Sequence, residues 1–175
     1  SSAQIRGLST AAVAAMSTTQ LSVMLENQIS ALTSAQVKAL SSTQINSLEE
    51  AQIQAIDSSA IEALSTSTLA ALTTTQLSRM STQQIGALNS TQVKALTTTQ
   101  LNALSELQIQ AFATADVAAL GTDKIAALSS LQLRNLSSAQ IAALTSDQVK
   151  ALSTEQLGNM LPFQVSAMKT DHIAA

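Results

Sequence analysis

An eight-residue repeat runs through the whole chain and limits what the chain can fold into. Counted from Ser1, the 175 residues divide into 21 octads and a final seven residues, without insertion or deletion. Position five is Ile, Val or Leu in all 22 units, and position eight is Leu, Met, Ile or Phe in all 21 complete octads. Position four is Gln, and position seven is Ala, in 16 units each. This regularity predicts one continuous octad-repeat array over residues 1–175.

Each octad contains the start and end signals of one short helix. Ser or Thr at position one, followed by Gln three residues later, is a capping box, as in Ser41 with Gln44. The only proline, Pro162, stands at position two, where the first turn of a helix tolerates it. Nine of the eleven acidic residues lie at positions one to three and six of the eight basic residues at positions six or seven, as the helix dipole favours. We therefore predict one helix per octad.

The octads cannot join into one long helix, because an apolar residue every eight positions would drift by about 80° per octad around a 3.6-residue turn. Helices this short are unstable alone and need neighbours. We predict an all-α solenoid of very short helices, with positions five and eight in a dry aliphatic core and positions three and six facing outward. We predict three to four helices per turn, about 3.5, because a ring of this size encloses a space that Ile and Leu side chains can fill. Seven helices per turn would leave a wide apolar hole open to water, which the hydrophobic effect opposes.

A second, slower period of 56 residues overlies the octads. The closely similar units TSAQVKAL, NSTQVKAL and TSDQVKAL begin at Thr33, Asn89 and Thr145. Seven octads make up this super-repeat. The period records duplication of a longer segment, or it arises because seven octads complete two turns. Both interpretations remain open at this point, and both are compatible with the predicted solenoid.

Composition excludes several classes of function. Charged residues make up 11% of the chain and the net charge is −3, so no basic stripe is available for nucleic acid. Apolar runs never approach the roughly 18 residues of a membrane span, so we expect no membrane insertion. The chain has no cysteine and one histidine, His172, which cannot build a typical zinc site. For His172 we predict a capping or surface role.

Catalytic chemistry is not expected either. Serine and threonine are abundant, but a serine nucleophile needs an adjacent base that a third group orients. Glu49, Glu50 and Asp57 lie close in sequence; we interpret them as solvated first-turn acids, with a weak calcium contact as the alternative. We therefore predict a protein that is not an enzyme, with no catalytic residues, no cofactor and no metal.

Outward-facing apolar residues are the only candidates for a partner site. Leu107, Leu131 and Phe163 occupy the variable position three, and Leu161 replaces the polar residue at position one. We interpret these four as isolated apolar surface residues, which are common, or as the approach to a terminal cap or a further domain. The alternative prediction is that they form a docking patch for a partner near the C-terminus.

Stretches such as ALTTTQLN, ALTSAQVKAL and ALTSDQVKAL resemble the short Ala-Leu-Ser/Thr-x-x-Gln repeats of large bacterial secreted or surface proteins of the adhesin type. The resemblance covers the whole chain and implies a stalk or spacer, located outside the cell or on its surface, whose partners are flanking domains of the same chain. It assigns no site residues.

Two hypotheses on function follow. The first is a non-enzymatic, rod-like spacer in a larger protein. The second is a binding module that presents regular Ser, Thr and Gln faces to a glycan, a protein or another repetitive ligand. Self-association of the array end to end is a further expectation.

Overall fold

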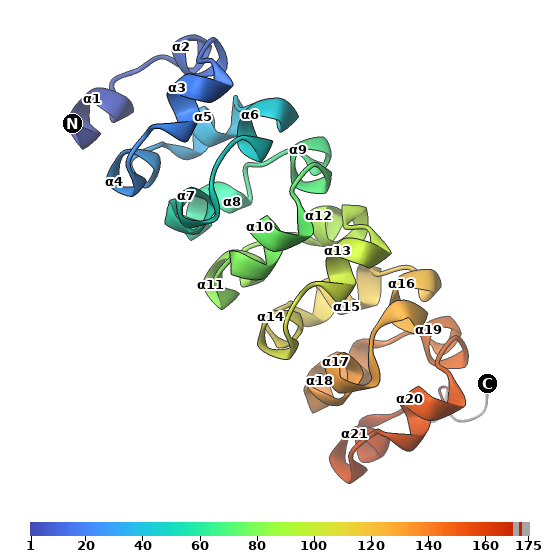
Figure 1. Cartoon of the computed structure of the whole chain (residues 1–175). Helices are drawn as coiled ribbons and strands as arrows, with labels where there is room; N and C mark the ends of the chain where they lie inside the picture. Colours follow the sequence, from blue (N-terminus) through green and yellow to red (C-terminus); the bar gives the residue numbers. More distant parts are fainter. Residues whose placement is uncertain (170–171, 173–175) are drawn as a thin grey trace. The chain divides into compact units, whose positions relative to one another are not determined.

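The computed structural model describes residues 1–169 and residue 172. The described residues form 21 short α-helices and contain no strand (Figure 1). The chain divides into two units, residues 1–88 and residues 89–175, which we call the N-terminal unit and the C-terminal unit. Each unit is considered by itself. The predicted all-α class, with one helix per octad, is confirmed.

The helices are four to six residues long. In the N-terminal unit they are α1 (Ser2–Arg6), α2 (Thr10–Ala14), α3 (Thr18–Ser22), α4 (Glu26–Ile29), α5 (Ser34–Lys38), α6 (Ser42–Asn46), α7 (Glu50–Ala55), α8 (Ser58–Ile61), α9 (Thr66–Ala70), α10 (Thr74–Arg79) and α11 (Thr82–Gly86). In the C-terminal unit they are α12 (Ser90–Ala95), α13 (Thr98–Asn102), α14 (Glu106–Gln110), α15 (Thr114–Ala119), α16 (Thr122–Ala127), α17 (Ser130–Arg134), α18 (Ser138–Ala143), α19 (Ser146–Lys150), α20 (Thr154–Gly158) and α21 (Pro162–Ala167).

The predicted capping boxes start most of these helices. At α6, the Ser41 hydroxyl accepts from the Gln44 backbone N–H at 3.2 Å, and the Gln44 Oε1 accepts from the Ser41 backbone N–H at 2.8 Å. Position one is extended, with φ −75° and ψ 163° at Ser41, and residues 39–41 connect α5 to α6. Pro162 is the first residue of α21, as predicted. The octad is therefore a helix with its own cap and a short link.

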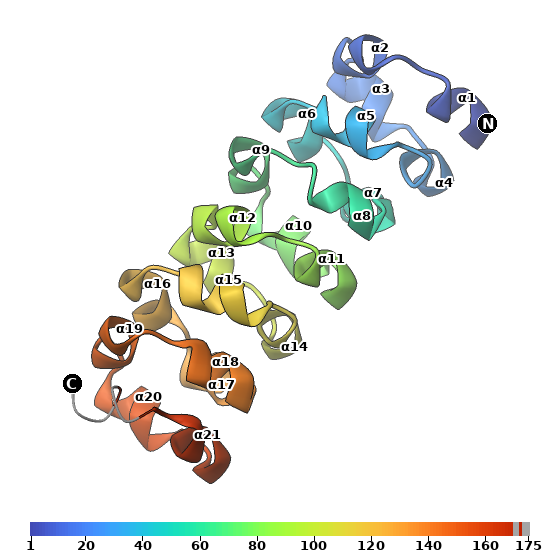
Figure 2. The ribbon, with the colours of Figure 1, turned by 180° about the vertical axis from the view of Figure 1, so that it is seen from behind.

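Helices three octads apart pack on each other throughout both units. In the N-terminal unit α1 packs against α4, α2 against α5, and so on to α8 against α11. In the C-terminal unit the series runs from α12 against α15 to α18 against α21. Figures 1 and 2 show α3, α6 and α9 following one another in this way. Each short helix thus gains its stability from the turns beside it.

Positions five and eight build the core, as predicted. Ile45 and Ile85 at position five are fully buried, and Leu48 and Leu88 at position eight are 3% exposed. Burying a side chain of this kind contributes about 1.5–3 kcal/mol. Exposed residues at positions three and six, such as Asn102, lie on the outside. Within each unit most octads contribute both side chains to the core, whereas Leu8, Leu157 and Val165, near the two ends of the array, are 37%, 40% and 49% exposed.

Candidate functional site

The glutamine at position four is the polar residue that the fold uses most heavily. Gln52, 4% exposed, accepts at Oε1 from the Glu49 backbone N–H at 2.8 Å and so caps α7. Its Nε2 donates to the backbone carbonyls of Leu21, Ser22 and Met24 at 3.0, 3.2 and 2.7 Å. These carbonyls belong to the end of α3 and the residues that follow it. One side chain therefore caps the start of its own helix and the end of a helix four octads earlier.

This contact recurs in both units. The glutamines that donate to carbonyls 28 to 31 residues upstream are Gln36, Gln44, Gln52, Gln76 and Gln84 in the N-terminal unit and Gln132, Gln140, Gln148, Gln156 and Gln164 in the C-terminal unit. No buried side-chain nitrogen or oxygen of the described residues lacks a hydrogen-bond partner. The capping role predicted from the sequence is confirmed, and the glutamines also connect successive turns.

The same contacts show how many octads make up one turn of the solenoid. A helix packs against the helix three octads later, while its glutamine reaches the octad four earlier. Within each unit one turn therefore takes between three and four octads, as predicted. The Nε2 contact to the position-eight carbonyl spans 28 residues, half of the 56-residue period. This agreement favours the geometric interpretation of that period.

Asp116 and His172 keep the capping function of the glutamine that they replace at position four, whereas Ala60 and Lys124 do not. Asp116, 3% exposed, accepts from the Ala113 backbone N–H at 3.0 Å and from the Ser90 hydroxyl at 2.7 Å. The Nδ1 of His172 accepts from the Lys169 backbone N–H at 3.2 Å. His172 is 7% exposed, so the capping role predicted for it is confirmed, at a buried rather than a surface position.

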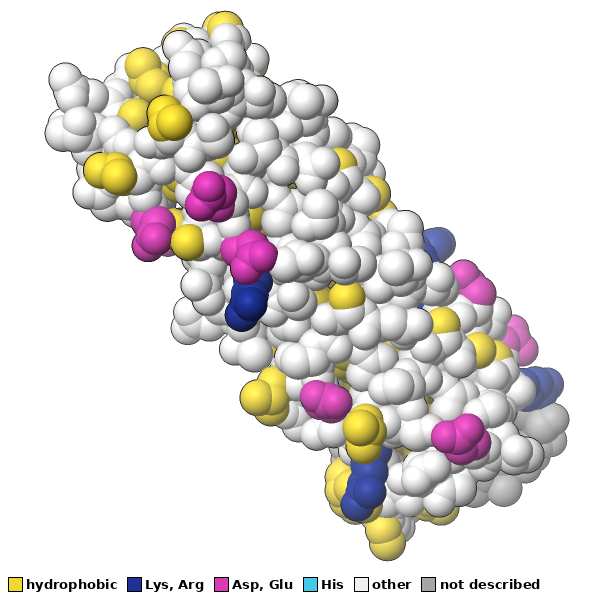
Figure 3. Space-filling model, viewed as in Figure 1, with side chains coloured by type: hydrophobic (Ala, Val, Ile, Leu, Met, Phe, Trp, Pro, Cys, Tyr) yellow, Lys and Arg dark blue, Asp and Glu magenta, His cyan; other side chains and the backbone are white. Residues whose placement is uncertain are grey.

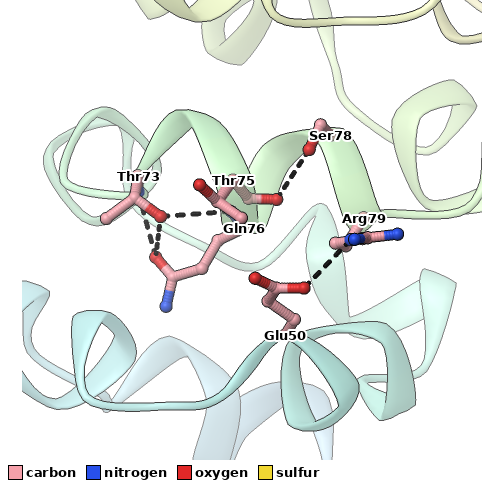
Figure 4. A network of polar contacts seen from close by, with 6 residues as sticks. All are labelled: Glu50, Thr73, Thr75, Gln76, Ser78 and Arg79. Carbon is pink, nitrogen blue, oxygen red and sulfur yellow. Dashed lines mark hydrogen bonds and ion pairs between the residues drawn. The ribbon is translucent and has the colours of Figure 1, made fainter.

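A polar groove of about 530 Å³ runs between α6, α7 and α10 in the N-terminal unit. It is lined by Asn46, Leu48, Glu49, Glu50, Ala51, Thr73, Thr75 and Gln76. Beside it, the Nε of Arg79 lies 2.9 Å from a carboxylate oxygen of Glu50, on the helix three octads away (Figure 4). Both side chains are well exposed, at 65% and 46%. Sequence analysis missed this pair, although their separation of 29 residues is close to one turn.

The acidic residues singled out from the sequence do not form a metal site. Glu49 and Glu50 line the groove just described, whereas Asp57 lines another pocket and caps α8 by accepting from the Ser59 backbone N–H at 2.8 Å. Hydrogen bonds from the Ser59 hydroxyl and backbone lower the pKa of Asp57. No set of three or more His, Asp or Glu side chains in the described part of the chain is placed to hold a metal ion.

The predicted docking patch is split between two pairs of helices. Leu107 on α14 and Leu131 on α17 are 64% and 59% exposed, and these two helices pack together. Phe163 on α21 is 48% exposed, and Leu161, the residue before that helix, is half-buried. α21 packs on α18. The structure thus brings Leu107 and Leu131 onto neighbouring helices, and whether a partner binds there stays a prediction.

Two stretches of the chain match the ALTTAQ repeat. The model of this repeat family matches residues 70–106 and 129–161, which together make up less than half of the chain. The match supports a repeat array and does not assign a host protein or a location. No curated protein matches the chain. Among the described residues, no helix has the length and apolar character needed to cross a membrane.

Proposed function

We propose that the chain is a non-enzymatic spacer, a structural repeat region that sets the distance between other parts of a larger secreted or surface protein. The observation that carries the proposal is the glutamine contact between turns. An octad packs on the octad three positions away, and in most octads the glutamine bonds to the octad four positions earlier, so adding octads extends the array without altering its existing contacts.

The surface supports the same proposal. Figure 3 shows a face that is mostly polar and uncharged, with scattered charged and hydrophobic side chains. Thirteen of the glutamines at position four are buried, so they are not offered to a ligand. Some hydroxyl groups at position two also form hydrogen bonds within the protein. The Ser42 hydroxyl, for example, donates to the carbonyl of Ser67 at 3.3 Å.

The test is to change the number of octads. Inserting a copy of residues 33–88, which is 56 residues or two turns, should lengthen the protein by about 16–20 Å at the usual helix packing distance. Spin labels at two fixed outer positions on either side of the insertion, measured by pulsed electron resonance, report that distance. A broad distribution or an unchanged mean distance would show that the array does not act as a spacer.

The groove beside Glu50 favours a second candidate function, the binding of a hydroxylated ligand such as a glycan. The groove is lined by side chains of the types that form hydrogen bonds with sugars. These are the hydroxyls of Thr73 and Thr75, the amide of Asn46 and the carboxylate of Glu49. A glycan-array screen tests this candidate, and Thr75→Ala is the matched variant for any hit. If no glycan binds above background, this second candidate function is excluded and the spacer remains the only proposed function.

A further inference from the structure

Two alanines, Ala12 and Ala60, replace glutamine at position four in the N-terminal unit, and of these only Ala60 has residues 28 to 31 positions upstream in this sequence. A buried glutamine at this position reaches carbonyls 28 to 31 residues upstream, as Gln84 does with Ile53, Gln54 and Ile56 at 2.9, 3.2 and 2.7 Å. Thr68, which also replaces glutamine, lies 2.8 Å from the Ser65 hydroxyl instead. Position four of the octad that forms α8 is Ala60, which is buried at 1% exposure. Its methyl group cannot donate a hydrogen bond.

The carbonyls that this repeat geometry assigns to position 60 belong to Ile29, Ser30 and Leu32, at the end of α4. The Ile29 carbonyl accepts from the Leu32 backbone N–H at 3.0 Å. In the part of the chain that the structure describes, no hydrogen bond to the carbonyl of Ser30 or Leu32 is present. Neither carbonyl is used by a donor among these described residues, so both are available to a donor from outside.

A pocket of about 300 Å³ lies at this point, within the N-terminal unit. Ser30, Leu32 and Ala60 line it, together with the charged residues Asp57 and Arg6. We call it the Ala60 pocket. The partial negative charge of the α4 carbonyl end and the Asp57 carboxylate favour a cation, and the Arg6 guanidinium opposes one. Arg6 and Asp57 are both exposed to solvent, which screens both charges, so the preference for a cation comes mainly from the carbonyls.

The C-terminal unit shows which cation fits such carbonyls. Position four of the octad that forms α16 is Lys124, and its Nζ donates to the backbone carbonyl of Lys94, 30 residues upstream. That is the spacing at which glutamine Nε2 reaches the position-six carbonyl. A primary ammonium group therefore takes the place of the glutamine amide within this fold.

From the Ala60 pocket and the precedent of Lys124, we propose that the N-terminal unit has a binding site for a primary alkylammonium group. The ammonium N–H groups donate to the Ser30 and Leu32 carbonyls, and the Asp57 carboxylate lies at the rim as the counter-charge. The alkyl chain leaves through the open side of the pocket. The site is independent of the spacer function proposed above.

The experiment is a titration of the ¹⁵N-labelled full chain with n-propylammonium chloride, followed by ¹H–¹⁵N correlation spectra. We expect saturable shifts at the amides of residues 30–34 and 57–60, with a Kd in the millimolar range, as expected for a ligand of only four heavy atoms. Tetramethylammonium chloride at the same concentration has the charge but no N–H donor. It should give no saturable shift at these residues.

Ala60→Gln is the matched variant, because glutamine stands at this position in 16 octads. It should fill the pocket and weaken propylammonium binding about tenfold or more. Ala60→Lys places a tethered ammonium group in the pocket, as at Lys124, and should also weaken propylammonium binding. It takes the place of Ala60→Gln in the test if Ala60→Gln does not fold. Equal shifts with tetramethylammonium, or unchanged binding in a folded variant, would overturn the proposal.

Discussion

Removal of one position-four glutamine should reveal how strongly the turns are held together. Gln84 is 2% exposed and makes hydrogen bonds at both ends of its amide. Its Oε1 accepts from the Ser81 backbone N–H at 2.9 Å, and its two amide hydrogens serve the carbonyls of Ile53, Gln54 and Ile56 at the distances given above. Because the amide has only two hydrogens, three carbonyls share two donors.

The expected loss of stability follows from the number of hydrogen bonds that the Gln84 side chain makes. One accepted and two donated hydrogen bonds, at about 0.5–1.5 kcal/mol each, make Gln84→Ala destabilising by about 1.5–4.5 kcal/mol. The control is Gln83→Ala, since the Gln83 side chain is exposed next to it and the change should stay within about 0.5 kcal/mol. Gln84→Glu keeps an acceptor for Ser81 but places a buried carboxylate oxygen against the three carbonyls, so it should cost at least as much stability as Gln84→Ala.

The assay is urea unfolding of the full chain followed by circular dichroism at 222 nm, because the chain contains no tryptophan. The free energies of unfolding of the three variants are compared with that of the parent protein. Similar values for Gln84→Ala and Gln83→Ala would refute the idea that the glutamines connect the turns. A small loss in Gln84→Glu beside a large one in Gln84→Ala would assign the stability to the cap alone.

Three further predictions concern the core, the ion pair and one carboxylate. Leu104→Ala should cost about 2–5 kcal/mol in urea unfolding because Leu104 is 3% exposed, whereas Asn102→Ala on the outer face should cost little; equal costs would contradict the octad frame. Arg79→Ala should change the free energy of unfolding by only about 0.2–1 kcal/mol, and less at high salt, because the ion pair in Figure 4 is exposed. The lowered pKa of Asp57 means that its contribution to stability is present above the unfolded-state pKa and is lost as pH falls through the folded-state value. Ser59→Ala should raise the pKa of Asp57 in a carbon-detected NMR titration, and an unchanged pKa would show that Ser59 is not its cause.

Much of this fold could be predicted from the sequence because its signals are local and repeat in every octad. Ser41 and Gln44 are three residues apart, so their reciprocal cap requires no knowledge of the rest of the chain. The burial of Ile45 and Leu48 follows in the same way from their spacing of three residues within one helix. Hydrophobic periodicity and capping chemistry by themselves determined the helices, their starts and the core positions.

Only the tertiary structure decided which groups meet across the turns. The second role of Gln52 depends on carbonyls 28 to 31 residues away, and their identity follows from the number of octads in one turn. The pairing of Glu50 with Arg79 and the pocket beside Ala60 have the same origin. A local sequence pattern does not encode the winding of a solenoid, because the winding is set by how side chains pack between turns.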